Sequence, residues 1–168
     1  MSPTFPTSNG MSWLRNILKR ISFLRRLVLR FRYGKPCVGS YSQIGEDIIV
    51  HYIFQRVGIT HPTYIDIGAN DPERFNNTAL LYEAGSRGIN IEPNPAVFRD
   101  LASIRVRDIN LNIGIGGKDG EADFYVFNDD KRSTFSKEAA ERLVTESPSL
   151  SYGVTIAQIS SLRAVIEK

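Results

Sequence analysis

The sequence Tyr-Ile-Asp-Ile-Gly-Ala-Asn-Asp-Pro at residues 64–72 has the pattern of a short strand that runs into a tight loop. Its first residues are mostly apolar or aromatic, which is typical of a parallel strand buried on both faces. Asp66 interrupts this run, and burying a carboxylate is unfavourable unless a partner binds it. Gly68 has no Cβ, so the chain can turn sharply there or approach a ligand closely. The stretch predicts the first strand and the ligand-binding loop of an α/β sheet.

A second strand is predicted at residues 88–92, Gly-Ile-Asn-Ile-Glu, and it ends in the acid Glu92. A strand, a small-residue loop, a helix and a second strand ending in a carboxylate form the nucleotide-binding half of a Rossmann-like sheet. The acid in that layout accepts hydrogen bonds from ribose hydroxyls. The alternative is an ordinary turn without a ligand, because Asp and Gly are common turn residues.

The loop lacks the glycines that bind a pyrophosphate. The NAD fingerprint Gly-x-Gly-x-x-Gly would need glycine at three positions, which are Gly68, Asn70 and Glu73 in this chain. The sequence also has no Gly-Lys-Ser/Thr, which excludes a P-loop. S-adenosylmethionine has a ribose but no phosphates, so it tolerates a looser loop. It is therefore the predicted cofactor, and an NAD-dependent enzyme is disfavoured.

The charge of the chain is unevenly distributed. The 168 residues carry a net charge of +3, but residues 1–35 contain eight Lys or Arg and no Asp or Glu. The remainder has 13 basic and 18 acidic residues, a net charge of −5. A mildly acidic body argues against nucleic acid as a partner. The length suits a single domain.

Cysteine and histidine are too few for a disulfide framework or a metal cluster. Cys37 is the only cysteine, and His51 and His61 are the only histidines and lie in unrelated contexts. We expect no intramolecular disulfide and no metal site. The usage fits a reducing compartment and predicts a cytoplasmic protein.

The N-terminal region is predicted to have two parts. Residues 1–12 are rich in Pro, Ser and Thr and are expected to be disordered. Residues 13–35 are expected to form a basic amphipathic helix, which Gly34-Lys35-Pro36 ends. Its apolar stripe consists of Leu14, Ile17, Leu18, Ile21, Leu24, Val28 and Phe31, and its basic side of Arg15, Lys19, Arg26 and Arg30. Residues 13–33 would suit an anionic membrane surface, giving a peripheral location. Docking on the domain or on a partner, and a transit peptide, are the alternatives.

The rest of the chain gives further expected elements. A helix capped by Ser40 or Ser42 would place Ile44, Ile48, Tyr52 and Ile53 against the sheet. A short helix is expected at residues 78–82, and another from Asn94 as N-cap with Pro95 in the first turn. Residues 107–115 read as one strand, with residues 122–127 as an antiparallel neighbour. Residues 128–152 look loop-like, with a helical turn near 137–143, and residues 155–166 are predicted to form a last helix.

Four motifs in order resemble the FkbM-type family of S-adenosylmethionine-dependent methyltransferases. They are Ser42-Gln43-x-Gly45-Glu46-Asp47, residues 65–72, Asn77-Thr78 and residues 88–95. The resemblance implies a Rossmann-like class I methyltransferase fold with helices on both faces of a parallel sheet. It also implies methyl transfer to a hydroxyl oxygen, on a small molecule or glycan such as a sugar or polyketide-type product. The implied cofactor-binding residues are Asp66, Gly68, Ala69, Asn70 and Glu92, with Gln43 and Glu46 near the pocket or its lid.

The resemblance covers about residues 40–168 and predicts a partial methyltransferase-like domain at residues 36–168. Family members continue past a segment like residues 154–159 into a fourth parallel strand, whereas this sequence stops at Lys168. The sheet is therefore expected to be incomplete, with residues 64–67 as an exposed apolar edge. That edge would pair with a second copy or with a missing C-terminal half. The alternative function is a non-catalytic cofactor-binding or interaction fragment. No catalytic base is assigned, and Asp71 and Glu73 are the candidates to test.

Overall fold

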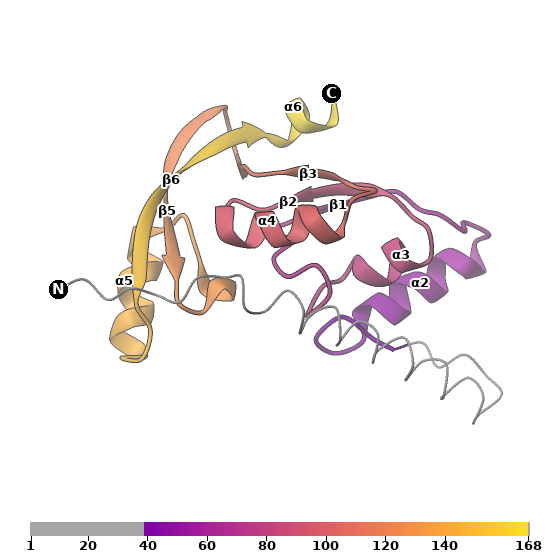
Figure 1. The fold of residues 1–168 in the computed structure, drawn as a ribbon, viewed down its shortest axis with the longest axis horizontal. Coiled ribbons are helices and arrows are strands. Elements are labelled where there is room, and N and C mark those ends of the chain that lie inside the picture. The colour runs from indigo at the N-terminus through magenta and orange to yellow at the C-terminus, as the bar shows by residue number, and fades with distance from the viewer. Residues whose placement is uncertain (1–38, 168) are drawn as a thin grey trace. The chain divides into compact units, whose positions relative to one another are not determined.

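The computed structural model describes residues 39–167 (Figure 1). The tail predicted at residues 1–12 and the helix predicted at residues 13–35 lie outside the described residues, as does Cys37. From Ser40 onward the chain belongs to one compact unit, which contains two small sheets.

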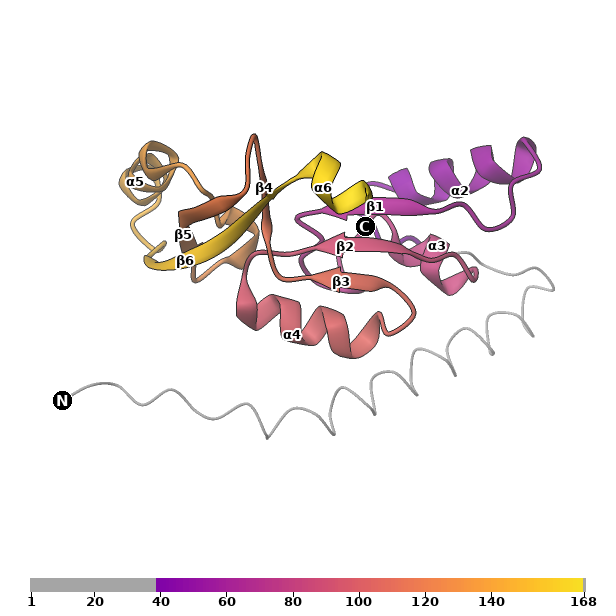
Figure 2. The same cartoon turned by 90° about the horizontal axis from the view of Figure 1, so that it is seen from above.

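The first sheet contains the two strands that the sequence predicts. Strand β1 spans Tyr64–Ile67, β2 spans Gly88–Ile91 and β3 spans Ile109–Leu111, in the order β1-β2-β3. Both strand pairs are parallel, and Figure 2 shows the three strands side by side. Strand β1 is an edge strand of this sheet, as the sequence predicts.

Helices α3 (Ala79–Glu83) and α4 (Pro95–Ile104) connect the three strands. The predicted cap of α4 is confirmed, because the Asn94 side chain accepts a hydrogen bond from Ala96 N and Pro95 occupies the first turn. Two right-handed crossovers that advance in the same direction place both helices on one face. Figure 1 shows α3 and α4 on the same side of the sheet. Helices on both faces are therefore not found for these two connections.

The two faces of the first sheet differ in character. The face toward α3 and α4 is polar, and Asn90 is fully buried there. On the opposite face Ile65 is 39% exposed, Ile67 is 53% exposed and Ile109 is also exposed. The prediction that β1 is buried on both faces is therefore wrong for the described residues. The strand alternates in burial because neither α3 nor α4 covers that face.

The single strand predicted at residues 107–115 is two strands in different sheets. The chain leaves β3 after Leu111, and β4 (Gly114–Gly116) pairs with a later strand. The intervening Asn112 side chain donates hydrogen bonds to the carbonyl oxygens of Glu92, at 2.7 Å, and Pro93, at 3.1 Å. These bonds fix the point where the chain passes from the first sheet to the second.

The second sheet corrects the prediction of a final helix at residues 155–166. Strand β6 (Tyr152–Ser161) occupies most of that range, and only α6 (Leu162–Ile166) is helical. Strand β5 (Gly120–Phe127) pairs antiparallel with β6, not with the strand that precedes it, and the order is β4-β6-β5. Residues 154–159 are rich in β-branched side chains, which pack well in a strand with a partner available.

Residues 128–152, predicted as mostly loop, contain a short 3-10 helix η2 (Asp130–Arg132) and helix α5 (Lys137–Glu146). The Ser136 hydroxyl caps α5 by accepting a hydrogen bond from Ala139 N at 3.1 Å. Helix α5 packs on the second sheet through a small core, whose members are Tyr125, Phe127, Ala140, Leu143, Val144, Leu150 and Tyr152. The helical turn near 137–143 is confirmed and is longer than predicted.

Helix α2 (Glu46–Arg56) begins at Gly45, which has a left-handed backbone with φ of 97°. This conformation explains a glycine at a helix start, since a Cβ is disfavoured there. The predicted cap by Ser40 or Ser42 is wrong, because Gly45 occupies the N-cap position and no side chain among the described residues caps the helix. Both serine hydroxyls instead donate to the buried carboxylate of Asp47. The face predicted to pack on the sheet is exposed in the described part of the chain, including Ile44, Ile48, Tyr52 and Ile53. Among residues 39–167, every helix is too short or too polar to cross a bilayer.

We expect Gly88→Ala to lower the free energy of unfolding by about 1–3 kcal/mol, the usual cost of overpacking. A Cβ at Gly88 would overlap the Tyr64 ring and lie 2.5 Å from the Tyr64 backbone oxygen, so β1 and β2 would have to separate. Gly153→Ala in β6 is the matched control, because a Cβ there meets no atom within 4 Å. Urea denaturation of both variants measures the difference. Equal stabilities would contradict the close approach of β1 and β2.

Candidate functional site

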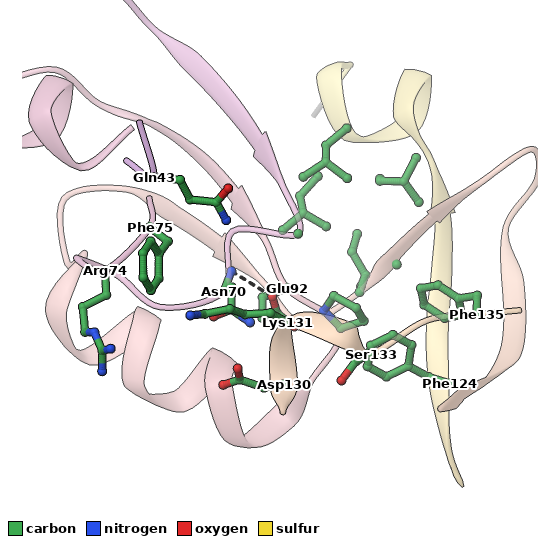
Figure 3. A pocket seen from close by; sticks show the side chains of 17 residues that line it. Gln43, Asn70, Arg74, Phe75, Glu92, Phe124, Asp130, Lys131, Ser133 and Phe135 are labelled. Carbon is green, nitrogen blue, oxygen red and sulfur yellow. Dashed lines mark hydrogen bonds between the residues drawn. The ribbon is translucent and has the colours of Figure 1, made fainter. Parts of the chain in front are cut away.

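A cavity of about 420 Å³ lies at the carboxyl ends of β1 and β2, where open α/β sheets usually bind ligands (Figure 3). Gln43 comes from the segment before α2. The first sheet and the loops after its strands supply a second group of lining residues: Ile67, Gly68, Asn70, Arg74, Phe75, Ile91, Glu92 and Pro93. The second sheet and the segment around η2 supply the others: Ile113, Gly114, Ile115, Phe124, Asp130, Lys131, Ser133 and Phe135.

Glu92 is the buried acid of the cavity and is only 4% exposed. One carboxylate oxygen accepts a hydrogen bond from Asn70 N at 2.9 Å, and the other accepts one from Asn94 N at 2.8 Å. Burial raises the pKa of Glu92, the two backbone donors lower it, and the charges of Asp130 and Asp66 raise it further. Each oxygen keeps acceptor capacity beyond its one backbone donor. Glu92 therefore joins the loops after β1 and β2 and can still accept hydrogen bonds from a ligand.

The loop after β1 turns back toward β2. Gly68 N and Ala69 N both donate to the carbonyl oxygen of Ile91, at 2.8 and 3.1 Å. Gly68 has φ of 74° and Asn70 has φ of 49°, both in the left-handed region. A Cβ at Gly68 would meet no protein atom within 4 Å, so the glycine leaves open space beside the loop. This geometry explains why glycine and asparagine, which tolerate that region, occupy these positions.

Asn76 organises the far part of the same loop. Its side-chain amide donates to the carbonyl oxygens of Ala69, at 3.0 Å, and Asp71, at 3.1 Å, while its oxygen accepts from Thr78 N at 3.0 Å. Asn76 is buried, so these bonds are protected from water. The sequence resemblance pointed to the next asparagine, Asn77, and missed this role.

The cavity brings together four of the predicted cofactor-binding residues, which are Gln43, Gly68, Asn70 and Glu92. The three others do not line it, for reasons that the geometry gives. Asp66 faces Thr78, whose hydroxyl donates to it at 2.8 Å, and burial raises the pKa of Asp66. Ala69 is buried within the loop. Glu46 is at the start of α2 and accepts a hydrogen bond from Ile44 N at 3.0 Å.

The two candidate bases, Asp71 and Glu73, are not among the residues that line the cavity. One oxygen of Asp71 accepts hydrogen bonds from Glu73 N, at 2.9 Å, and Arg74 N, at 2.7 Å. This pattern is an Asx turn, in which the side chain stabilises the loop backbone. The geometry therefore gives Asp71 a structural role in the loop.

The second sheet supplies an aromatic wall that sequence reasoning missed. The rings of Phe124 and Phe135 lie 4.6 Å apart between centroids. Gly114 makes room for this pair, because a Cβ there would overlap the Phe135 ring. No local pattern marks these residues as a site, since they reach the cavity only through the pairing of β5 with the distant strand β6.

A cationic cluster lies on another side of the cavity and consists of Arg74, Phe75 and Lys131 (Figure 3). The Lys131 ammonium lies 3.8 Å from the centroid of the Phe75 ring, and the Arg74 guanidinium carbon lies 5.8 Å from it. Arg74 and Phe75 belong to the loop after β1. Their place in this loop is the feature of the sequence that could have identified them. Lys131 belongs to η2 and has no such signal.

Carboxylate and imidazole groups do not gather into a metal site in this part of the chain. Within residues 39–167, no group of three or more His, Cys, Asp or Glu side chains has an arrangement that would hold a metal ion. A ligand in the cavity would meet Glu92, the loop backbone, the aromatic wall and the cationic cluster.

The family model for the methyltransferase FkbM domain matches residues 66–165, which run from the second half of β1 through β2 and the loops after these strands to the second sheet. Comparisons with the curated proteins and with the solved structures found no match. The matched range is well over half of the 168 residues. The chain thus belongs to the FkbM methyltransferase family.

Proposed function

We propose that this chain binds S-adenosylmethionine in the cavity and transfers its methyl group to a hydroxyl oxygen of a sugar or polyketide-type acceptor. The observation that carries the proposal is Glu92, a buried acid at the end of β2 that lines the cavity and has unused acceptor capacity. Family membership supports methyl transfer.

The residues present fit this cofactor in three respects. Glu92 offers two carboxylate oxygens to the ribose hydroxyls. Gly68 leaves open space beside the loop, so a ligand can approach the backbone closely. Asp130 also lines the cavity, and with Glu92 it gives this side a negative charge that suits the cationic sulfonium. The cofactor would supply an electrophilic methyl group on a good leaving group.

The chain's own contribution is positioning. Loop 68–76 is fixed by the amide of Asn76 and by the bond from Asn70 N to Glu92, so the residues that line the cavity are held before a ligand arrives. Such preorganisation is where most of the rate of a positioning enzyme comes from. The aromatic pair Phe124 and Phe135 keeps one wall of the cavity apolar and limits water there.

A second candidate function is cofactor binding without catalysis. The observation that favours it is the position of Asp71 and Glu73, the two candidate bases, neither of which lines the cavity. Transfer of labelled methyl groups from S-adenosylmethionine to hydroxylated acceptors separates the two candidates. Binding without transfer to any acceptor would favour the second.

We expect calorimetric titration of the chain to show saturable binding of S-adenosylmethionine, with S-adenosylhomocysteine as a competitor and no comparable binding of NAD. The reason is that Glu92 can accept hydrogen bonds from ribose hydroxyls, whereas the loop lacks the glycines that let a backbone approach a pyrophosphate. ATP, which has a ribose and phosphates, is the control for non-specific nucleotide binding. Tight binding of NAD without binding of S-adenosylmethionine would overturn the choice of cofactor.

A further inference from the structure

The cationic cluster of Arg74, Phe75 and Lys131 holds two positive charges that the described residues do not neutralise. The acids next to them in sequence are engaged elsewhere or exposed: Asp129, for example, pairs with Arg132 at 3.1 Å. Between residues 39 and 167, the ion pairs within 4 Å include neither Arg74 nor Lys131. Their contacts in the structure are with the Phe75 ring.

Phe75 is held in an unusual conformation that presents its ring outward. Its φ of 55° lies in the left-handed region, which bulky residues rarely adopt, and its side chain is 47% exposed. Such strain costs about 1–3 kcal/mol and persists only where the surroundings enforce it. Both sequence neighbours of Phe75 are held in place. Arg74 N donates a hydrogen bond to Asp71, and the Asn76 side chain is buried. The loop therefore fixes a ring that orients two cations at the cavity.

The cavity lining carries charges of both signs. Glu92 and Asp130 are its acids, whereas Arg74 and Lys131 are cations within reach of the Phe75 ring. Figure 3 shows Arg74 and Phe75 at one end of the cavity and Lys131 nearer to Glu92 and Asp130. The two acids suit the ribose and the sulfonium of the cofactor. The cationic cluster suits an anion, because two unpaired cations gain most from a ligand that brings negative charge without a cation of its own.

We propose that the methyl acceptor is anionic, and that Arg74 and Lys131 bind its phosphate or carboxylate beside the Phe75 ring. This inference rests on the proposed function, since it names the acceptor class of the same cavity. The carboxylate of the cofactor is the competing ligand for these cations. It is the weaker candidate, because it carries an ammonium group next to it that both cations would repel.

The test compares three matched hexoses, which are glucose, glucuronate and glucose 1-phosphate, on the full chain saturated with S-adenosylhomocysteine. We expect either or both of the anionic hexoses to bind about tenfold more tightly than glucose, the effect of about one charge-assisted hydrogen bond. The preference is expected to weaken with added salt. Comparison of the two anionic sugars distinguishes a carboxylate from a phosphate site. Equal binding of all three, or binding of neither anionic hexose, would overturn the proposal.

The variant Arg74→Gln/Lys131→Gln is expected to remove the preference for the anionic hexoses and to leave the affinity for S-adenosylmethionine within about twofold. Both side chains are exposed, so the substitutions should not disturb the core. Lys137→Gln/Arg163→Gln is the matched control, since it removes two exposed cations that are paired with Glu141 and Glu167 and do not line the cavity.

The outcomes separate this inference from the proposed function. A large loss of cofactor affinity in Arg74→Gln/Lys131→Gln, with the control unchanged, would assign the cations to the carboxylate of the cofactor and contradict an anionic acceptor. Failure of the unmodified chain to bind S-adenosylmethionine would contradict the proposed function itself. The same preference for anionic hexoses in the variant as in the unmodified chain would show that the cluster does not bind them.

Discussion

Replacing Arg105 with methionine is expected to lower the free energy of unfolding by about 3–5 kcal/mol, the cost of leaving a buried charge without its partner. Arg105 is 1% exposed and follows α4, where it joins three parts of the first sheet and its loops. Its Nε donates to Asp108 at 2.9 Å, and the side chains of both residues are almost completely buried. Methionine keeps an unbranched apolar stem, is shorter than arginine and removes every donor.

The donors of Arg105 reach the loop that lines the cavity. One terminal nitrogen donates to the carbonyl oxygen of Pro72 at 3.2 Å, and the other donates to the hydroxyls of Tyr64, at 2.7 Å, and Thr78, at 3.0 Å. Burial raises the pKa of the Tyr64 phenol, which therefore stays protonated and donates to Asp108 at 2.8 Å. Arg105→Met removes these bonds together, so we expect cofactor binding to weaken along with stability.

Guanidinium denaturation measures the effect, and Arg163→Met is the matched control. Arg163 also pairs with a carboxylate, Glu167, at 3.5 Å, but both side chains are exposed, and exposed pairs contribute about 0–1 kcal/mol. A second variant, Arg105→Met with Asp108→Asn, removes the remaining charge and should recover part of the loss. If Arg105→Met and Arg163→Met were equally stable, the buried network would not be a main source of stability.

The parts of the fold that the sequence predicts are those with a local signal. The strand that ends in Glu92 has a short apolar run with a terminal acid, and α4 has an Asn-Pro start that the structure confirms. Gly45 and Gly68 also mark positions where the backbone takes the left-handed conformation. In each case neighbouring residues fix the local conformation, so a pattern in the sequence is sufficient.

The parts that the sequence misses depend on distant pairing. Residues 155–166 fit a helical spacing, yet β6 forms because β5 offers a long antiparallel partner. The aromatic wall and Lys131 reach the cavity through that second sheet, so local patterns did not mark them. Asp66 was expected at the ligand because a buried acid needs a partner, and the partner is Thr78 within the protein. The sequence indicated that Asp66 needs a hydrogen-bond partner, but it did not indicate that this partner is Thr78 instead of a ligand.

Replacing Glu92 with glutamine is expected to weaken S-adenosylmethionine binding by about 1–3 kcal/mol, which is roughly 5- to 150-fold. Glutamine keeps the shape of the side chain and one acceptor oxygen. Its amide nitrogen would face either Asn70 N or Asn94 N, which the carboxylate now accepts at 2.9 and 2.8 Å. Calorimetric titration measures the loss, and Glu146→Gln, at an exposed ion pair with Arg142, is the matched control.

The dependence on pH separates a ligand-binding role of Glu92 from a purely structural one. Burial raises the pKa of Glu92 above its ordinary 4.5, so the carboxylate is protonated at a higher pH than usual. Protonation removes an acceptor for the ribose hydroxyls, and we expect cofactor affinity to fall as the pH is lowered through this raised pKa. The raised folded pKa has the opposite effect on stability, since the folded state then holds the proton more tightly than the unfolded chain.

Titrations on acidification from neutral pH therefore give a distinctive result, because the raised pKa makes Glu92 protonate at a higher pH than an unperturbed carboxyl does. The unmodified chain should bind the cofactor less tightly as the pH falls. Over the same range, the contribution of Glu92 to the free energy of unfolding should grow. Glu92→Gln should show lower affinity that changes little with pH, because the titrating group is gone. His51 and His61 do not line the cavity and remain in both proteins, so their effects cancel in the comparison. Parallel pH profiles in the two proteins would mean that Glu92 only joins the two loops, and that the ribose is bound by other residues.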